Sequence, residues 1–474
     1  MNIKASNMDG WFAAVIGSLD TKPLYSRIFV AIDQAIREGM VQAGDVLPTQ
    51  RELAQRIGWP LSTVTRGYQD AVSRGLIRTD RRNGSTVLGK DETGHVRRDA
   101  PLVPPSFFEQ SDVYDLTKQA LISPLYAESV KHALATLSDN PAALFNNLRY
   151  SSGQLDVNAR KSFIEFFAAH YQLSLDAQNL ILTSGAQNAL VCALLSLFSP
   201  GDNIGCEHFT YRGLQYAARI ARLNLIPIEM DERGIKPDRL QAAIVAHSIK
   251  GVVCVPNYQN PTATTMSEER RREVASVAAR HRILVIEDDV YGLLAGNKIA
   301  PIFSHYPEGT FLINGVSKAL GPGLRVGVII CPAKFDIQLS TAVRATTWMP
   351  SQVDVSVIGS MLANRSASRI IEQNKKILNH RTSRLVELLK GHRVSFGVCC
   401  PHAVVHLPPT LRPALLIDWL QAERIHVEGA DLFTIGEHSG NFIRINLTGV
   451  FKDENFNYAI GRIATALTAH ADLL

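Results

Sequence analysis

Apolar residues recur at helical spacing in three stretches near the start of the chain. The first covers residues 23–39, in which leucine, isoleucine and alanine side chains line one helical face. The second covers residues 49–58, where Thr49 can act as an N-cap and Glu52 as its capping-box partner. The third covers residues 60–74. The pattern predicts three short helices, and the first two end at glycines.

The third stretch also has a polar and basic face. Ser62, Thr63, Thr65 and Arg66 lie on the side away from its apolar residues. Two short helices joined by a tight turn, the second with such a face, are typical of a helix-turn-helix that enters the DNA major groove. Residues 75–87 then indicate a hairpin with a basic Asn-Gly tip, which would form a wing. A small helical domain with a solvated arginine cluster is the alternative.

The pattern changes after residues 90–108, which lack periodicity, mix charges and contain three prolines. We interpret this segment as a linker. Beyond it, short apolar stretches alternate with helical ones, and the expected strands are 179–182, 203–206, 225–229, 251–255, 283–287, 311–313 and 326–331. This alternation predicts a mainly parallel sheet that binds ligands at its carboxyl edge.

Composition narrows the class of protein. The chain has 474 residues, 46% of them hydrophobic, which suffices for two or more globular domains. We find neither a long apolar run nor a secretion signal. The six cysteines are scattered and lack paired metal-ligand spacing. We therefore expect a cytoplasmic protein without a metal site.

Charge is concentrated at one end of the chain. Residues 1–90 carry 12 Lys and Arg against 8 Asp and Glu, which gives +4 of the total net charge of +5. A small basic module on a nearly neutral body indicates that the first part binds a polyanion.

Lys318 is the first candidate for chemistry. It follows the expected strand 311–313 within Ser317-Lys318, and a Gly-Pro-Gly turn leads from there to Arg325. A lysine near a strand end can form a Schiff base with an aldehyde, while Ser317 and Arg325 suit the oxygens of a phosphate. Pyridoxal phosphate carries both groups. From this stretch alone, a solvated loop lysine and a surface arginine are equally good interpretations.

Further candidate groups follow other expected strands. Residues 185–187 lie at a helix start, where backbone N–H groups can bind a phosphate. Tyr211 could stack on a pyridine ring, and Asn260 precedes a proline that favours an extended backbone. Asp288 follows a strongly apolar strand, where a pyridinium nitrogen would be a suitable partner. Each motif alone also fits a plain turn, a core tyrosine or a helix cap, but their order along the chain favours a cofactor site.

Residues 22–88 resemble the winged helix-turn-helix of GntR-type regulators. The motifs that carry the resemblance are Leu-Pro-x-x-Arg-x-Leu-Ala, Thr-Val-x-x-x-Tyr and Gly-Leu-Ile. The resemblance implies that double-stranded operator DNA is contacted by Arg51, Thr63, Thr65, Arg66, Arg82 and Gly84. Ser85 stands where the family usually has a second glycine, so the wing tip departs from the pattern.

Residues 114–474 resemble the fold-type I aminotransferases. The resemblance implies an α/β fold with a large, mainly parallel α/β/α domain, a smaller C-terminal α+β subdomain (approximately 335–474), pyridoxal 5'-phosphate as cofactor and a homodimer. Lys318 would form the Schiff base and Asp288 would pair with the pyridine nitrogen. The groups that would hold the rest of the cofactor are Asn260 and Tyr291 at the phenolic oxygen, Tyr211 on the ring, and Gly185, Ala186, Gln187, Ser317 and Arg325 at the phosphate.

Two further positions are implied by the same resemblance, and three depart from it. Tyr150 would reach the neighbouring subunit's phosphate site, and Arg444 would bind a substrate carboxylate. Ala263 stands where glycine is usual, Gly315 replaces a common phosphate-binding hydroxyl, and Leu155 occupies another glycine position. We expect these departures to preserve cofactor binding and to weigh against fast transamination.

The two resemblances together are the arrangement of the MocR regulators. The predicted parts are an N-terminal arm (1–21), a winged helix-turn-helix (22–88), a linker (89–113) and an aminotransferase-like domain (114–474). This implies a transcription regulator that senses an amine, an amino acid or a B6 vitamer through an aldimine at Lys318. An active aminotransferase with an accessory DNA-binding head is the alternative, and a scaffold that needs the cofactor only to fold is a third.

Overall fold

The computed structural model describes residues 24–37, 40–42, 44–73, 76–80, 84–87, 113–119, 121–150, 157–295, 299–436, 440–450 and 452–471. The chain divides into two compact units, Met1–Gln110 and Ser111–Leu474, here called the head and the body. The predicted arm (1–21) and most of the predicted linker (89–113) lie outside the described residues.

Three helices and a three-stranded sheet form the described part of the head. They are α2 (Leu24–Arg37), β1 (Val46–Leu47), α3 (Gln50–Ile57), α4 (Leu61–Ser73), β2 (Ile77–Asp80) and β3 (Gly84–Val87). The sheet is antiparallel in the order β1-β3-β2. The three predicted helices and the predicted hairpin are thus confirmed.

Local chemistry explains how α3 begins and how closely α4 packs. The Thr49 hydroxyl accepts a bond from the Glu52 N–H at 3.2 Å, and the Glu52 carboxylate accepts one from the Thr49 N–H at 2.9 Å. The predicted capping box is therefore present. A Cβ on Gly67 would lie 2.6 Å from the Ile28 Cβ, so only glycine lets α4 lie this close to α2. Ile28, Val64 and other apolar side chains form the head's core.

A seven-stranded sheet forms the centre of the body. Its strands, in spatial order, are β5 (Leu180–Thr183), β13 (Gly327–Ile330), β12 (Thr310–Gly315), β11 (Leu284–Asp288), β10 (Gly251–Cys254), β6 (Asn203–Glu207) and β7 (Asn224–Ile228). All neighbours are parallel except β13, which is antiparallel to both β12 and β5. The expectation of a mainly parallel sheet is confirmed, whereas the reversed strand was not predicted.

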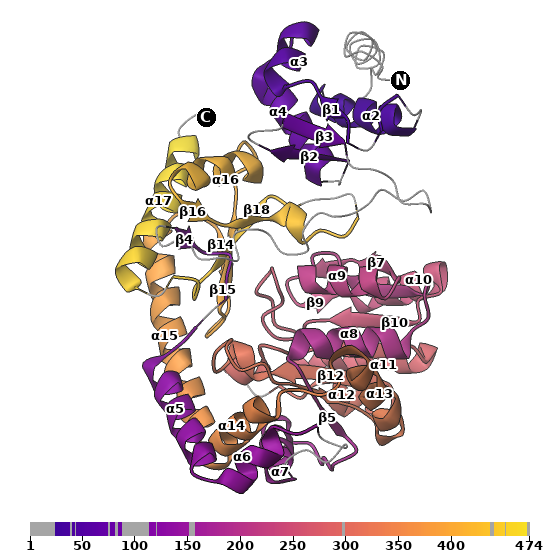
Figure 1. Ribbon diagram of the computed structural model, residues 1–474, viewed down its shortest axis with the longest axis vertical. Coiled ribbons are helices and arrows are strands. Elements are labelled where there is room, and N and C mark those ends of the chain that lie inside the picture. Colours follow the sequence, from indigo (N-terminus) through magenta and orange to yellow (C-terminus); the bar gives the residue numbers. More distant parts are fainter. Residues whose placement is uncertain are drawn as a thin grey trace. The chain divides into compact units, whose positions relative to one another are not determined.

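Helices cover both faces of this sheet (Figure 1). Adjacent strand residues point to opposite faces, so Ile286 packs in the core beside α8 (Ala186–Leu197) and Val285 packs in the core beside α11 (Glu268–His281). The other helices of the large domain are α7 (Val157–Tyr171), α9 (Arg212–Ile220), α10 (Pro237–His247), α12 (Ile302–His305) and α13 (Asp336–Thr347). A short hairpin, β8 (Met230–Asp231) and β9 (Gly234–Ile235), precedes α10.

A second, four-stranded antiparallel sheet belongs to the C-terminal subdomain. Its order is β14 (Val394–Phe396), β15 (His402–His406), β18 (Phe442–Asn446) and β17 (Glu428–Gly429). Beside it lie α15 (Ser366–Leu388), α16 (Pro413–Ala422) and α17 (Asp453–Ala471), while α5 (Pro124–Ser138), α6 (Pro141–Asn147) and α14 (Gln352–Ala363) pack together near the far end of α15 (Figure 1).

The start of the body joins this C-terminal subdomain. Strand β4 (Tyr114–Asp115) pairs in parallel with β16 (Ile425–His426), and the Asn446 N–H donates to the Leu116 carbonyl at 2.8 Å. The pairing of β4 with β16 was not predicted from the sequence. Among the described helices, none is long and apolar enough to span a lipid bilayer.

Candidate functional site

Lys318 lies directly after a buried central strand. Strand β12 is buried along its whole length, and the 3₁₀ turn η3 (Val316–Lys318) follows it without a loop. Burial, together with the positive charges of Arg444 and Arg325, lowers the pKa of the Lys318 ammonium to about 8. An appreciable fraction of this amine is therefore neutral near physiological pH, as a nucleophile must be.

Asp288 ends the neighbouring strand, β11, and pairs in register with Ile313 of β12. Its side chain is buried, and its Oδ1 has no hydrogen-bond partner among the described residues. Burial first, and the charge of Asp289 second, raise the pKa of the Asp288 carboxyl to about 7. A buried carboxyl oxygen without a partner fits a cationic group such as a protonated ring nitrogen.

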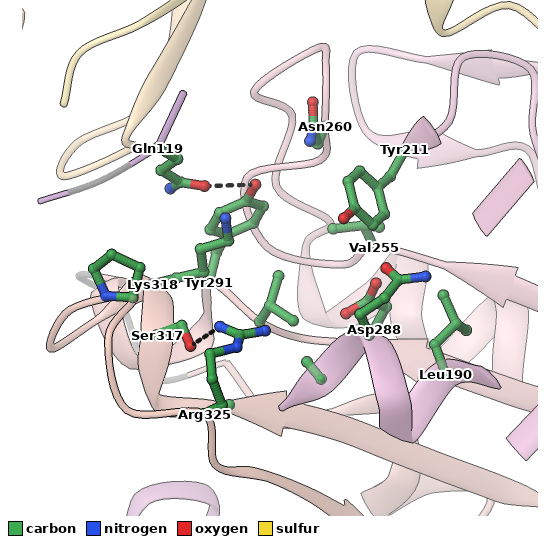
Figure 2. Close-up of a pocket in the computed structure, with 15 residues that line it drawn as sticks. Gln119, Leu190, Tyr211, Val255, Asn260, Asp288, Tyr291, Ser317, Lys318 and Arg325 are labelled. Carbon is green, nitrogen blue, oxygen red and sulfur yellow. Dashed lines mark hydrogen bonds between the residues drawn. The ribbon is translucent and has the colours of Figure 1, made fainter. Parts of the chain in front are cut away.

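The start of α8 provides a site for an anion. Gly185 is its N-cap, and no side chain caps the helix, so its first N–H groups remain available. Gly185 has φ 88°, and a Cβ there would lie 2.7 Å from Arg325 Nη2, so both the backbone angle and the close approach require glycine. Arg325 Nη1 donates to Ser317 Oγ at 2.6 Å (Figure 2). These donors suit the oxygens of a phosphate.

Polar side chains from four loops complete the rest of the site. The Tyr291 hydroxyl donates to Gln119 Oε1 at 3.2 Å, and Asn260 Oδ1 accepts a bond from Arg444 Nη1 at 3.0 Å. Tyr211 precedes α9 and stands near Asp288 in Figure 2. Gln119 could not be predicted from the sequence, because only the pairing of β4 with the C-terminal subdomain brings this segment to the site.

Most of the predicted cofactor residues surround one cavity of about 120 Å³ (Figure 2). Those that line it are Ala186, Gln187, Tyr211, Asn260, Asp288, Tyr291, Ser317, Lys318 and Arg325. An amine, a buried carboxyl with one unpartnered oxygen and an uncapped helix start thus meet at one place. This donor set fits the aldehyde, ring nitrogen and phosphate of pyridoxal phosphate.

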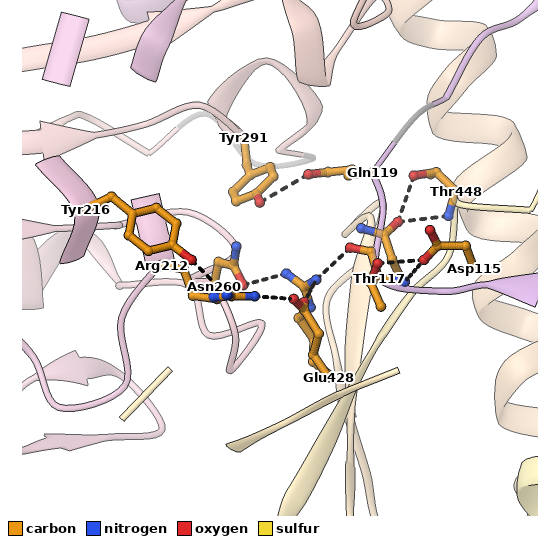
Figure 3. A network of polar contacts seen from close by, with 11 residues as sticks. Asp115, Thr117, Gln119, Arg212, Tyr216, Asn260, Tyr291, Glu428 and Thr448 are labelled. Atoms are coloured by element: carbon orange, nitrogen blue, oxygen red, sulfur yellow. Dashed lines mark hydrogen bonds and ion pairs between the residues drawn. The ribbon is translucent and has the colours of Figure 1, made fainter. Parts of the chain in front are cut away.

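Arg444 contacts Asn260 and is already paired within the chain. Its Nη2 donates to the Thr117 carbonyl at 2.8 Å and forms an ion pair with Glu428 Oε2, while Glu428 Oε1 lies 3.1 Å from Arg212 Nη1. Figure 3 shows Glu428 beside Arg212 and Asn260. Neither Glu428 nor Arg212 was predicted from the sequence, because no motif reveals which residue faces Arg444 across the sheet.

Tyr150 does not line the cavity of its own chain. It is 81% exposed, and its ring centroid lies 6.0 Å from that of Trp348, which is also exposed. Phe145 and Leu148 are exposed nearby in the sequence. A cluster of exposed aromatic and aliphatic side chains of this kind marks a candidate interaction surface.

The polar face of the head is built from α3 and α4. Arg51 and Arg66 are exposed, and the Arg66 guanidinium lies 4.0 Å from the centroid of the Tyr25 ring. The Thr65 hydroxyl donates to Gln50 Oε1 at 2.9 Å, which links the two helices, and Thr63 is half-buried. Both arginines are therefore available to phosphates, whereas Thr65 has an intramolecular partner.

The described part of the wing explains the departure at Ser85. This residue is buried, and its hydroxyl lies 2.9 Å from the Thr79 hydroxyl on the paired strand. Gly84 begins β3 with φ 76°, a left-handed conformation that favours glycine. The predicted DNA contact Arg82 lies outside the described residues.

The fold and the cavity together define a class of protein, the pyridoxal-phosphate enzymes of fold type I and their relatives. Residues 124–463 match the family model "Aminotransferase class I and II", and residues 24–87 match "Bacterial regulatory proteins, gntR family". The chain therefore belongs to the class I and II aminotransferase family and, with its GntR-type head, has the architecture of the MocR-type transcription regulators.

Individual relatives agree with this assignment. The HTH-type transcriptional regulator YdeF of Bacillus subtilis is 27% identical over 80% of this chain and 79% of its own length. The vitamin B6 salvage pathway transcriptional repressor PtsJ of Salmonella typhimurium is 24% identical over 78% of this chain and 82% of its own. The kynurenine aminotransferase of Pyrococcus horikoshii has the same fold, with a TM-score of 0.70, 22% identity and coverage of 76% and 92%.

Proposed function

We propose that this transcription regulator holds pyridoxal 5'-phosphate at Lys318 and senses an amine, an amino acid or a B6 vitamer through it. The observation that carries the proposal is the convergence of Lys318, Asp288 and the start of α8 on one cavity, in a chain that begins with a winged helix-turn-helix. The similarity to a repressor of vitamin B6 salvage supports a vitamer as one class of effector.

The chain's own residues have distinct tasks in this proposal. Pyridoxal phosphate, when bound, supplies an aldehyde carbon that a primary amine can attack. Lys318 offers a partly neutral amine at that position, and Asp288 offers a carboxylate to the ring nitrogen. The α8 N–H groups, Ser317 and Arg325 hold the phosphate. Tyr291 and Asn260 orient the other side of the ring.

An active aminotransferase is the second candidate function. The lowered pKa of Lys318 favours it, because an amine with a pKa of about 8 can both accept and release a proton near neutral pH. Ala263 weighs against it: this residue has φ 62°, a strained conformation for alanine that glycine adopts freely. Sustained amino-group transfer to an oxo acid at about 1 per second or faster would favour the enzyme.

Lys318→Ala tests the cofactor proposal. Borohydride reduction of the wild-type protein with pyridoxal phosphate should fix the cofactor to the peptide that contains Lys318, as read by mass spectrometry. The variant should lose this label and any amine-dependent change in affinity for DNA selected from a random library. Lys334→Ala, which removes an exposed lysine of the same unit, is the control and should behave as wild type. A label on another lysine would contradict the assignment.

A further inference from the structure

Glu428 lies directly opposite Arg444 on the neighbouring strand. The two strands, β17 and β18, are antiparallel. Side chains at such a pair point to the same face and lie close together. The ion pair between Glu428 Oε2 and Arg444 Nη2 therefore follows from the backbone pairing, not from the placement of a loop.

Both oxygens of this carboxylate are engaged, Arg444 is buried, and Glu428 is mostly buried. Glu428 Oε1 lies 3.1 Å from Arg212 Nη1, and Arg212 Nη2 donates to the Tyr216 hydroxyl at 2.7 Å (Figure 3). The exposed fractions of the Arg444 and Glu428 side chains are 8% and 15%. Moving Glu428 away would leave a buried guanidinium without its counter-charge, which is costly. Glu428 is therefore a fixed part of the site.

Two of the three nitrogens of Arg444 already have partners within the chain, while its buried Nε has none among the described residues. Its Nη1 donates to Asn260 and its Nη2 to the Thr117 carbonyl as well as to Glu428. A ligand carboxylate that approached Arg444 would also approach Glu428, and like charges at close range disfavour a complex. The positive charge of Arg444, which would attract the carboxylate of an amino acid, is thus neutralised by Glu428.

We propose that Glu428 takes the place of the ligand carboxylate at Arg444, so that the effector is a primary amine that carries no carboxylate. The proposal rests on the proposed function, since Arg444 faces an effector only if the cofactor is held at Lys318. Glu428 is then the residue that determines effector specificity, and Arg212 is a positioning residue that holds Glu428 from the other side.

Matched pairs of ligands test the proposal on the full chain loaded with pyridoxal phosphate. Phenylalanine with phenethylamine, alanine with ethylamine, and lysine with 1,5-diaminopentane each differ by one carboxylate. Each compound is titrated while the absorbance of the bound cofactor is followed. In the wild type, each amine should produce half of the spectral change at a concentration at least about tenfold lower than its amino acid.

Glu428→Gln keeps the shape of the side chain and removes its charge. The concentration of amino acid that gives half of the spectral change, divided by that of the matching amine, should fall by about tenfold or drop below one. The reason is that Arg444 is then free to bind an external carboxylate. Glu423→Gln is the matched control. Glu423 forms an ion pair with Arg462 at 2.9 Å that shares no partner with Arg444, so the ratio should stay as in the wild type.

The possible failures are distinguishable. A protein that shows no absorbance from bound cofactor would overturn the proposed function, and this inference with it. A normal cofactor spectrum with an equal or stronger response to the amino acids would overturn this inference alone. The wild-type ratio decides the question even if the Glu428→Gln protein does not fold.

Discussion

At the scale of single residues, the site contains a buried carboxyl that lacks a paired cation. This carboxyl belongs to Asp288, and burial raises its pKa to about 7, above the value of 3.8 that it has when exposed. Between these two pH values the unfolded chain has released this proton and the folded chain retains it. The free energy of unfolding therefore decreases as the pH rises from about 4 to about 7. The decrease is complete above the pKa that Asp288 has in the folded chain.

Asp288→Asn should remove this cost in the cofactor-free protein. At pH 8 the variant should be more stable than the wild type by up to a few kcal/mol, and the difference should shrink towards pH 4. Thermal unfolding at both pH values measures the effect. Added pyridoxal phosphate should favour the wild type instead, because the ionised carboxylate then gains a cationic partner. A variant that is less stable at pH 8 without cofactor would contradict the proposed ionisation of Asp288.

The same residues show how far sequence reasoning reaches. The structure brings Lys318 and Asp288 to one cavity because both lie at the carboxyl ends of neighbouring parallel strands. Such ends meet at one edge of the sheet. Glu428 and Gln119 could not be found in this way. Each reaches the site through a pairing between distant segments, β17 with β18 and β4 with β16, and no local pattern specifies those partners.

At the scale of elements, helices and strands were predicted well where local chemistry sets their ends. The capping box at Thr49 and the left-handed Gly58 fix α3, and the strongly apolar strands of the large sheet were located to within one or two residues. The direction of β13 was not predictable, because an apolar run buried on both faces has the same pattern in either direction.

Helix α4 carries the prediction for DNA binding. Arg66→Ala removes an exposed guanidinium that packs over Tyr25, and it should weaken binding to selected DNA while the absorbance of bound cofactor stays unchanged. If Arg66 contacts a phosphate, the salt dependence of the affinity should also fall by about one unit of slope.

Arg56→Ala is the matched control for this prediction, since it removes one positive charge from the last turn of α3. Its salt dependence of DNA affinity should have a slope closer to that of the wild type than the slope of Arg66→Ala. Equal slopes for all three proteins would exclude a phosphate contact by Arg66.

At the scale of the whole molecule, we propose a homodimer. The exposed side chains of Leu148, Tyr150 and Trp348 support it, and the family resemblance expects Tyr150 at the neighbouring subunit's phosphate site. Leu148→Asp places a charge in this cluster and should raise the dimer dissociation constant at least about thirtyfold, which corresponds to roughly 2 kcal/mol. Sedimentation equilibrium measures the change, and cofactor retention should fall with dimer content.

Val245→Asp provides the control, because Val245 is a comparably exposed aliphatic residue on α10. This variant should remain as dimeric as the wild type. A Leu148→Asp protein of unchanged mass in solution would show that the interface lies elsewhere.

The pairing of β4 with β16 also determines where the tether to the head is anchored. The first described residues after the predicted linker are held by the subdomain that contains Arg444, not by the sheet that ends at Lys318. Arg444 itself donates to the Thr117 carbonyl, three residues beyond Tyr114. Any rotation of this subdomain about the large domain would therefore displace residues 114–117 by the same rigid-body movement.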